Sequence, residues 1–422
     1  MVVKDPLKLL VVVRPFPKEG GGSYRALKSL IEYPSYGIYP YLLIPPTDYD
    51  VYDFSTLSLL KTRDVKIIDF LKYYSKNIVV RRMQTLLHLA IPKIFIGIDL
   101  KKYPRNIDAV LSFHETWDAL WIAYFIASKT EKTSIAILQL PPFYVSKNRQ
   151  KTLYLAFKLY YNCIYGKYSI WKFLAQLHHD MSEMLVIRNI MQILHKYSFI
   201  IGISRAICVE SGLESSGRAI CMDPGVSLDE QDLNLINIIR NRYREKKGYV
   251  VFGGRPTATK GIVEAFLVFR DIVKRYNNCR LVITGGIHGS RASKFLRFAK
   301  RLGIGDKVVF TGFVSREERF RIVREAKLML YPSHVDAFPY AVAESFLLGT
   351  PVVAYDIPAI DIYYKGFEGI RIVRELDMDA MASEAIDILS RDKVDVEAPR
   401  LRPWRDIIEE EVSLIKRVVE RF

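Results

Sequence analysis

Short runs of β-branched and other apolar residues alternate with longer amphipathic stretches along the whole chain. This alternation is typical of a parallel sheet whose strands are joined by crossover helices. We expect one series of strands at 8–13, 39–44, 65–69, 109–113, 134–138, 199–203 and 218–222, and a second at 249–252, 280–284, 307–310, 328–331, 351–355 and 370–373. The sequence therefore predicts an α/β protein.

Each series of strands has the length of one doubly wound domain, and the polar, turn-rich segment 223–230 lies between them. We predict an N-terminal domain over 1–225 and a C-terminal domain over 226–402. Two such domains facing one another would hold a ligand in the crevice at the carboxyl ends of their strands.

The chain of 422 residues carries 62 Lys and Arg against 46 Asp and Glu, a formal net charge of +16. Such an excess favours an anionic partner, and nucleic acid, anionic lipid and phosphorylated small molecules all qualify. The apolar run 7–13 is interrupted by Arg14 and Pro15, so we expect neither a secretory signal nor a membrane span. The cysteines form no C-x-x-C pair, and we expect reduced thiols in a cytoplasmic protein: Cys163, Cys208, Cys221 and Cys279.

A first anion site is predicted where the strand ending at Phe252 runs into Gly253, Gly254 and Arg255, with Lys260 five residues after the arginine. Glycines at a strand end let a ligand approach the backbone, and both cations could reach an anion before the following helix. The alternative is an ordinary glycine turn with two solvated cations.

A second site is predicted after the strand ending at Tyr331, where a loop carries Asp336 and a helix beginning near Pro339 carries Glu344 in its second turn. A nucleotide diphosphate sugar has matching parts: its diphosphate suits the helix N-terminus, its ribose suits Glu344, and its sugar would face Asp336. The alternative makes Asp336 a loop cap and Glu344 a solvated residue.

The order of these blocks resembles the retaining glycosyltransferases of family four, which have the GT-B fold. The similar blocks are Gly253–Gly261, Leu281–Gly286, Val308–Val314, Tyr331–Ser333 with the Asp336/Glu344 spacing, and Gly349–Ala354, and they cover the second half of the chain. The first half agrees more loosely, at Pro15–Ser23, Asp108–His114 and Pro224–Val226. The resemblance implies two facing Rossmann-like domains, with the amphipathic segment 403–422 packing back on the first.

The resemblance also implies roles for the matching positions. Arg255 and Lys260 would bind the donor diphosphate, Glu344 the ribose and Asp336 the sugar hydroxyls. These two cations and a helix dipole would stabilise the departing nucleoside diphosphate, so that neither a metal nor a cofactor is expected. The remaining donor-binding positions are Gly21, Gly22 and Gly254, which leave space, Phe313 and Val314 near the base, and the backbone of Phe338, Pro339, Tyr340 and Ala341 at the phosphates.

This sequence departs from the family pattern at three places. Asp336 stands where the family usually has Glu, and Ala337 and Pro339 replace common glycines. Gln139 stands where many relatives carry a histidine near the transferred sugar, and it cannot shuttle a proton at neutral pH. His114, one strand earlier, is the substitute candidate, against the alternative of a polar loop residue.

The segment from Lys147 to His179 is rich in basic and aromatic residues and contains no acidic residue. Its aromatic residues recur at helical spacing, and such a helix suits a membrane interface. The alternative is that the stripe packs as core on the first sheet. Cations among aromatics also suit single-stranded nucleic acid, but nothing else indicates a nucleic-acid module. The stripe consists of Tyr154, Phe157, Tyr161, Tyr165 and Tyr168, and a second basic patch holds Lys72, Lys76, Arg81 and Arg82.

Taken together, these features predict a hexosyltransferase at the cytoplasmic face of the cell membrane. It would move a sugar from a UDP- or GDP-sugar to a lipid-linked or membrane-near glycan, with retention of configuration, and would bind an anionic membrane surface through 147–179. Two alternatives remain open: a GT-B nucleotide-sugar epimerase, and a non-catalytic nucleotide-sugar-binding subunit. The sequence leaves open the base, the sugar, the acceptor, the linkage and the oligomeric state.

Overall fold

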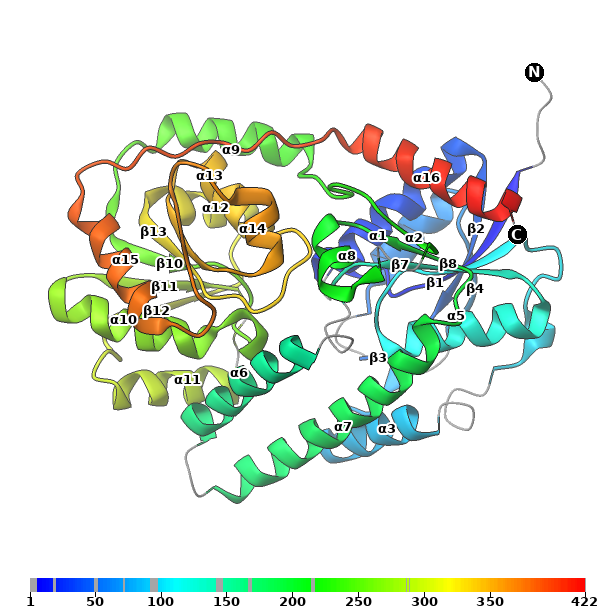
Figure 1. Cartoon of the computed structure of the whole chain (residues 1–422), viewed down its shortest axis with the longest axis horizontal. Coiled ribbons are helices and arrows are strands. Elements are labelled where there is room, and N and C mark those ends of the chain that lie inside the picture. Colours follow the sequence, from blue (N-terminus) through cyan, green and yellow to red (C-terminus); the bar gives the residue numbers. More distant parts are fainter. Residues whose placement is uncertain are drawn as a thin grey trace. The chain divides into compact units, whose positions relative to one another are not determined.

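Each of two units of the chain is built around its own parallel sheet in the computed structural model (Figure 1). The first unit comprises 1–146, 175–226 and 402–422, and the second comprises 147–174 and 227–401. The structure describes residues 6–17, 20–48, 52–70, 73–91, 98–141, 147–165, 169–213, 217–285, 287 and 289–421.

The sheet of the first unit has seven parallel strands in the order β4-β2-β1-β6-β7-β8-β9. They are β1 (Leu7–Val12), β2 (Ile38–Ile44), β4 (Lys66–Phe70), β6 (Ala109–Ser112), β7 (Thr133–Leu138), β8 (Phe199–Gly202) and β9 (Ala219–Cys221). The strand order reverses between β1 and β6, which pair in register from Leu9 opposite Ala109. In a doubly wound sheet, ligands bind at the carboxyl ends of the strands flanking this reversal.

The sheet of the second unit has six parallel strands in the order β12-β11-β10-β13-β14-β15. They are β10 (Lys247–Phe252), β11 (Arg280–Thr284), β12 (Val308–Gly312), β13 (Ala326–Tyr331), β14 (Val352–Tyr355) and β15 (Ile370–Val373). Here the order reverses between β10 and β13. The predicted anion site follows β10 and the predicted acidic site follows β13, so the fold brings them to one place.

Every strand predicted from the sequence is present, with ends displaced by two residues at most. The prediction works because strands of a parallel sheet are buried on both faces and need uninterrupted apolar runs. It misses the two-residue strands β3 (Thr47–Asp48) and β5 (Tyr73–Tyr74), which pair with each other in a separate small sheet.

Helices complete both units. In the first they are α1 (Gly21–Glu32), α2 (Phe54–Thr62), α3 (Ile78–Ala90), α5 (Trp117–Thr130), α8 (Arg205–Ser211) and α16 (Trp404–Arg421). In the second they are α6 (Lys147–Tyr165), α9 (Glu230–Arg242), α10 (Ile262–Arg275), α11 (Gly289–Arg301), α12 (Arg316–Glu325), α13 (Tyr340–Leu347), α14 (Pro358–Tyr364) and α15 (Met378–Ser390). The division between the units falls inside α7 (Ile170–Leu194), after Leu174.

The division of the chain differs from the predicted domains in one segment. The first unit ends at Val226 and includes 402–422. Residues 147–174, however, belong to the second unit and not to the N-terminal domain. Tyr160 on α6 meets Phe295 on α11 edge to face, with ring centroids 6.2 Å apart, and Lys294 lies over the Tyr165 ring. Tyr160 and Tyr165 of α6 therefore pack within the second unit.

The C-terminal helix α16 is fixed to α1 by a buried polar network. Arg25 on α1 pairs with Glu411 on α16 at 2.5 Å, and the Tyr33 hydroxyl donates to the other Glu411 oxygen at 2.8 Å. The Arg25 Nε donates to the Gly225 carbonyl at 2.7 Å, next to the point where the chain leaves the first unit. One arginine thus joins the first helix, the last helix and the segment between the units.

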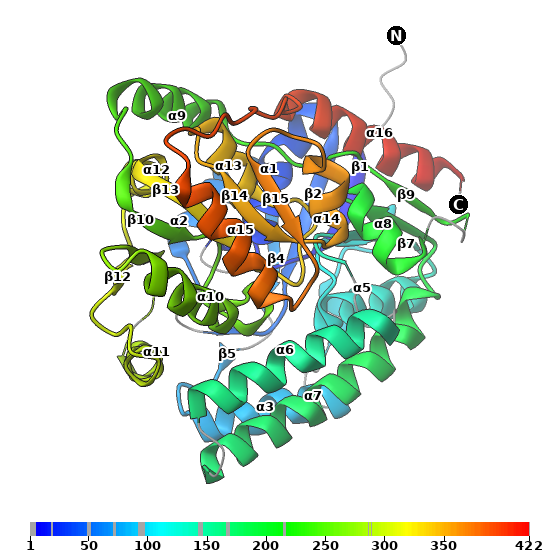
Figure 2. The same ribbon diagram turned by 60° about the vertical axis from the view of Figure 1, so that its left-hand side comes forward.

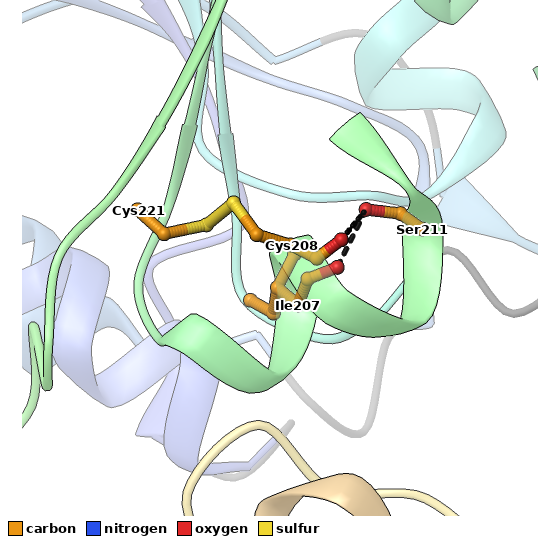
Figure 3. The surroundings of a disulfide bond; sticks show 4 residues. All are labelled: Ile207, Cys208, Ser211 and Cys221. Atoms are coloured by element: carbon orange, nitrogen blue, oxygen red, sulfur yellow. Dashed lines mark hydrogen bonds between the residues drawn. A yellow bond between two sulfur atoms is a disulfide. The ribbon is translucent and has the colours of Figure 1, made fainter. Parts of the chain in front are cut away.

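A disulfide joins Cys208 on α8 to Cys221 on β9, with Cα atoms 6.2 Å apart (Figure 3). This corrects the expectation of four reduced thiols; Cys163 and Cys279 are the free cysteines. The two cysteines are 13 residues apart in the sequence, and no motif marks them as a pair. They come together because β9 joins the sheet beside α8. Gly202 lies opposite Cys221 in the ladder, and a Cβ there would come within 2.5 Å of the Cys221 sulfur.

Removing this disulfide will lower the stability of the first unit. Closing a loop of this length contributes about 3 kcal/mol, so the double variant Cys208→Ser/Cys221→Ser should melt roughly 6–12 °C lower. Thiol titration of the unfolded, unreduced protein should find two thiols, and the reduced protein four. Four thiols before reduction, or an unchanged melting temperature, would contradict the prediction. Cys163→Ser serves as the control, since it removes a free thiol.

Candidate functional site

The anion site after β10 begins with two glycines that the fold requires. A Cβ on Gly253 would come within 2.6 Å of the Met329 sulfur, and Gly254 has a φ of 135°, which disfavours side chains. The short helix Ala258–Lys260 follows, and Gly261, at φ 69°, leads into α10. A Cβ on Gly261 would lie only 2.0 Å from the Pro332 carbonyl oxygen, so the β10 and β13 loops pack closely together here.

The structure brings Lys260 and Asp336 together at the carboxyl ends of β10 and β13. The Lys260 ammonium donates to Asp336 Oδ2 at 2.6 Å and to the Val335 carbonyl at 2.7 Å. The Tyr331 hydroxyl donates to the same Asp336 oxygen, and burial, followed by the Asp336 charge, holds the pKa of Tyr331 well above its usual range. An ammonium has three hydrogens, so Lys260 retains one for a phosphate oxygen.

Glu344 lies in the second turn of α13, as predicted, but it is buried and not solvated. Arg319 on α12 holds it with two parallel hydrogen bonds, the one from Nη2 to Oε1 measuring 2.9 Å. Each Glu344 carboxylate oxygen has a second lone pair, so Glu344 can still accept hydrogen bonds from the two hydroxyls of a ribose. Arg319 could not be found from the sequence, because no motif marks α12.

The other predicted donor-binding residues of the second unit follow the carboxyl ends of β10, β12 and β13. Arg255 is exposed in the glycine turn, and Phe313 after β12 is 81% exposed. Val314 is half-buried beside it. At the start of α13, Phe338 and Pro339 are buried and Tyr340 and Ala341 are half-buried, and the Tyr340 amide donates to the Phe338 carbonyl at 2.9 Å. That amide is therefore engaged in a turn, and only a rearrangement would direct it to a phosphate.

His334 anchors the loop that carries Asp336. Its ring is fully buried and lies between Glu264 on α10, at 2.9 Å, and Glu375 after β15, at 2.8 Å. Burial alone would lower the pKa of His334, but the hydrogen bonds and charges of both carboxylates outweigh it and raise the pKa to about 9. The backbone N–H of His334 donates to Thr259 at 2.9 Å, which ties this loop to the anion site.

The stability of the second unit will therefore depend on pH. The folded pKa of about 9 lies above the ordinary value of 6.5, so the charged ring stabilises the fold fully below pH 6.5 and not above pH 9. Urea unfolding should report a loss of about 3 kcal/mol across this interval, and His334→Gln should flatten the curve. A profile that is equally steep in that variant would contradict the assignment. The groups facing the ring are Glu264, Glu375 and Tyr355, with Arg149 on Glu375.

In the first unit, a separate group of predicted residues gathers at the carboxyl ends of β1, β6 and β7. Gly21 and Gly22 form the first turn of α1, and a Cβ on Gly22 would come within 3.1 Å of Gln139 Cβ. Gln139 is buried, and both its amide oxygen and nitrogen are buried without a hydrogen-bond partner. A buried amide without partners costs free energy, so this side chain is suited to a polar ligand.

His114 lies in the same group. Its Nε2 is 3.4 Å from the Ser23 hydroxyl, and burial, followed by the Arg14 charge, lowers the pKa of His114 to about 4. The ring is therefore neutral at physiological pH, and its lowered pKa makes it a weak base that can accept a hydrogen bond. Glu115, which the sequence analysis missed, accepts the backbone N–H groups of Gln139 and Leu140 at 3.1 and 3.2 Å.

No three side chains of His, Cys, Asp or Glu gather as metal ligands would among the residues that the structure describes. The segment 377–379 has the D-x-D pattern that binds a metal in some proteins. Its first residue, Asp377, caps α15 by accepting a hydrogen bond from the Ala380 amide at 2.9 Å. Within the same described ranges, no helix is long and apolar enough to span a membrane.

Solved structures with the same architecture cover nearly the whole chain. Sucrose-phosphate synthase from Thermosynechococcus elongatus matches with a TM-score of 0.62 at 14% identity, over 99% of this chain and 100% of that one. HepE from Anabaena, solved in complex with UDP and glucose, matches with a TM-score of 0.57 at 13% identity, over 97% and 99% of the two chains. The fold is GT-B.

Sequence comparison concentrates on the second GT-B unit. Residues 236–400 match the family model described as "Glycosyl transferases group 1". An uncharacterised glycosyltransferase from Methanocaldococcus jannaschii is 30% identical over 139 residues, and the D-inositol 3-phosphate glycosyltransferase of Mycolicibacterium smegmatis is 30% identical over 116. These matches cover 32% and 27% of this chain, and 35% and 27% of the two relatives. The similarity in sequence thus covers only about a third of this chain, and the same share of each relative.

Proposed function

We propose that the chain is a glycosyltransferase that moves a sugar from a UDP- or GDP-sugar to a glycan acceptor with retention of configuration. The observation that carries the proposal is the Lys260–Asp336 pair where the strand order of the second sheet reverses, with Glu344 on the adjoining helix. Arg255, Lys260 and Arg319 outnumber Asp336 and Glu344, which favours a diphosphate ligand. The group 1 glycosyltransferase match over 236–400 supports the same class.

The residues would divide the work by charge. Lys260 and Arg255 would stabilise the negative charge that develops on the departing nucleoside diphosphate, Glu344 would accept the ribose hydroxyls, and Asp336 would orient the sugar. We assign no covalent nucleophile and route no step through a metal. In the first unit, the unsatisfied amide of Gln139 and the neutral ring of His114 would form hydrogen bonds to hydroxyl groups of the acceptor.

The test offers UDP- and GDP-sugars with and without a polyprenyl-diphosphate glycan and measures nucleotide release. Release that depends on the acceptor, with retention in the product by NMR, supports the proposal. Consumption of donor without acceptor would indicate an epimerase instead, and binding without release in any acceptor panel would indicate a binding subunit. If neither nucleotide class binds, the proposal fails.

We further propose that the acceptor is membrane-near and that α7 and α3 dock on the cytoplasmic face of an anionic membrane. Within the predicted segment 147–179, the aromatic stripe on α6 is partly buried: Phe157, Tyr161 and Tyr165 are half-buried, and Tyr168 lies outside the described residues. More strongly exposed apolar side chains lie on α7, where Trp171 is 69% exposed and Met184 is 63% exposed. The others on α7 are Ile170, Phe173, Leu174, Leu177 and Met181.

Helix α3 adds a second apolar stripe beside α7, and Figures 1 and 2 both show the two helices running alongside each other. Its exposed residues are Val79, Val80, Met83 and Leu87, and Arg81 and Arg82 lie between them. Arg82 interacts with His178 on α7, which confirms that the helices touch. Apolar stripes flanked by cations are suited to the head-group region of anionic lipid.

Co-sedimentation with vesicles of phosphatidylglycerol or phosphatidylcholine tests this surface. We expect binding to the anionic vesicles that weakens in high salt, and roughly tenfold weaker binding by Met184→Ser/Met83→Ser, because two exposed apolar anchors of the first unit are lost. Tyr154→Ser, on α6, is the matched control. Equal binding by the double variant and the control would show that the contact lies elsewhere. If the wild-type protein binds neither kind of vesicle, the proposal fails.

A further inference from the structure

Arg149, in the first turn of helix α6, contacts the loop that carries Asp336. The Arg149 Nη1 donates to Glu375 Oε2 at 2.6 Å, and its Nη2 donates to the carbonyl oxygen of His334. The side chain is 12% exposed, so these are largely desolvated, charge-assisted contacts. In sequence, Arg149 lies between β7 and β8 of the first sheet, but it contacts the Asp336 loop of the second unit.

Glu375 links Arg149 to the buried ring of His334. One carboxylate oxygen accepts from Arg149 and the other meets His334 Nδ1 at 2.8 Å, while Glu264 meets the opposite ring nitrogen. With the histidine charged, two cations balance two carboxylates. Removing Arg149 would leave the pocket with an excess negative charge and would free the His334 carbonyl from its donor.

The same loop is held on its other side by Lys260. The carbonyl of His334 accepts from Arg149, and the carbonyl of the next residue, Val335, accepts from the Lys260 ammonium at 2.7 Å. Asp336 follows directly and accepts from Lys260 at 2.6 Å. Two consecutive carbonyls are therefore fixed by cations from different elements, one on α6 and one in the anion site.

We propose that Arg149 is a positioning residue for donor binding, through which helix α6 sets the geometry of the Lys260–Asp336 pair. This inference rests on the proposed function of that pair. Arg149 itself touches neither the diphosphate nor the sugar in this role; it holds the loop that does. The segment 147–165 is then part of the donor site's support, in addition to any part that α7 has in membrane docking.

A second tether of α6 provides a matched control. Arg301 on α11 donates to the carbonyl of Cys163 near the end of α6, and its guanidinium lies over the Phe298 ring, 5.6 Å from the centroid. Arg301→Ala therefore loosens the same helix at its far end without touching the Asp336 loop. If α6 acted only as packing, the loss of either arginine would have the same effect.

The experiment compares Arg149→Gln, Arg149→Lys and Arg301→Ala in the full chain, with UDP and GDP binding by calorimetry and donor KM and kcat in the nucleotide-release assay. We expect Arg149→Gln to raise the donor KM roughly tenfold, with kcat changing less, because a charge-assisted contact to the loop is lost. Arg149→Lys should recover part of the affinity by pairing with Glu375, and Arg301→Ala should stay near the wild-type KM.

Three results would overturn the inference while leaving the proposed function standing: equal donor KM in Arg149→Gln and wild type, equal loss in Arg149→Gln and Arg301→Ala, or an effect on kcat alone. A wild-type chain that binds neither UDP nor GDP would instead overturn the proposed function, and the inference with it. If Arg149→Gln does not fold, the comparison of Arg149→Lys with Arg301→Ala decides, since Lys keeps the charge but makes one contact where Arg makes two.

Discussion

Alanine in place of Lys260 will lower kcat/KM for the nucleotide-sugar donor by roughly 10²- to 10³-fold, the usual cost of losing one preorganised charged donor at a developing negative charge. The loss has two sources here. The diphosphate loses its cation, and Asp336 keeps its negative charge without the ammonium 2.6 Å away, so it repels the donor. Steady-state nucleotide release across a donor concentration series measures the change.

Lys307→Ala is the matched control for this variant. Lys307 lies just before β12, at the opposite end of the sheet, and donates to the Asn277 carbonyl at 2.6 Å. It belongs to the same unit but not to the carboxyl ends of the strands, so its removal should change kcat/KM less than about twofold. Comparable losses in the two variants, or full turnover in Lys260→Ala, would show that the pair is not the donor site.

Glu411→Ala will destabilise the first unit by roughly 3–5 kcal/mol, the cost of breaking a buried ion pair by removing one partner. Arg25 is 2% exposed and Glu411 is fully buried, so the variant leaves an uncompensated cation inside the protein. The Tyr33 hydroxyl loses its acceptor as well. Urea unfolding followed by tryptophan fluorescence is suitable, because Trp404 at the start of α16 stacks against Lys28, 4.0 Å from the ring centroid.

The neighbouring residue Glu410 provides the comparison. It pairs with Arg402 at 2.8 Å but is 34% exposed, so Glu410→Ala should cost at most about 1 kcal/mol. An apolar double variant, Arg25→Met/Glu411→Leu, should regain much of the stability lost in Glu411→Ala, since the cost comes from an unpaired charge. If Glu410→Ala and Glu411→Ala unfold at the same urea concentration, the buried network does not hold α16.

The sequence predicts the two sheets because each strand carries its own signal. A run such as that of β14, Val352–Tyr355, must be apolar throughout to be buried on both faces, whatever it pairs with. The sequence also predicts that Lys260, after β10, and Asp336, after β13, lie close together. Neighbouring parallel strands end at the same edge of a sheet, and the loops that follow them meet there. The Lys260–Asp336 contact follows from topology alone once those strands are recognised.

The interactions that the sequence did not predict join elements without a local pattern. Cys208 and Cys221 pair only after β9 enters the sheet, and Arg319 reaches Glu344 only after α12 packs beside α13. Helix α6 has an amphipathic sequence that fits several surfaces, and the sequence left open whether its aromatic residues meet a membrane or pack as core. Its choice depends on Phe295 and Glu375, which come far later in the chain.

The placement of α6 also has a consequence for synthesis on the ribosome. Domains generally fold as the chain emerges, starting from the N-terminus. Residues 147–165 leave the ribosome before the first sheet has received β8 and β9, and well before α11 and the Asp336 loop exist. The aromatic side of α6 therefore stays exposed until its packing partner α11 has been synthesised. During this interval a chaperone could bind it.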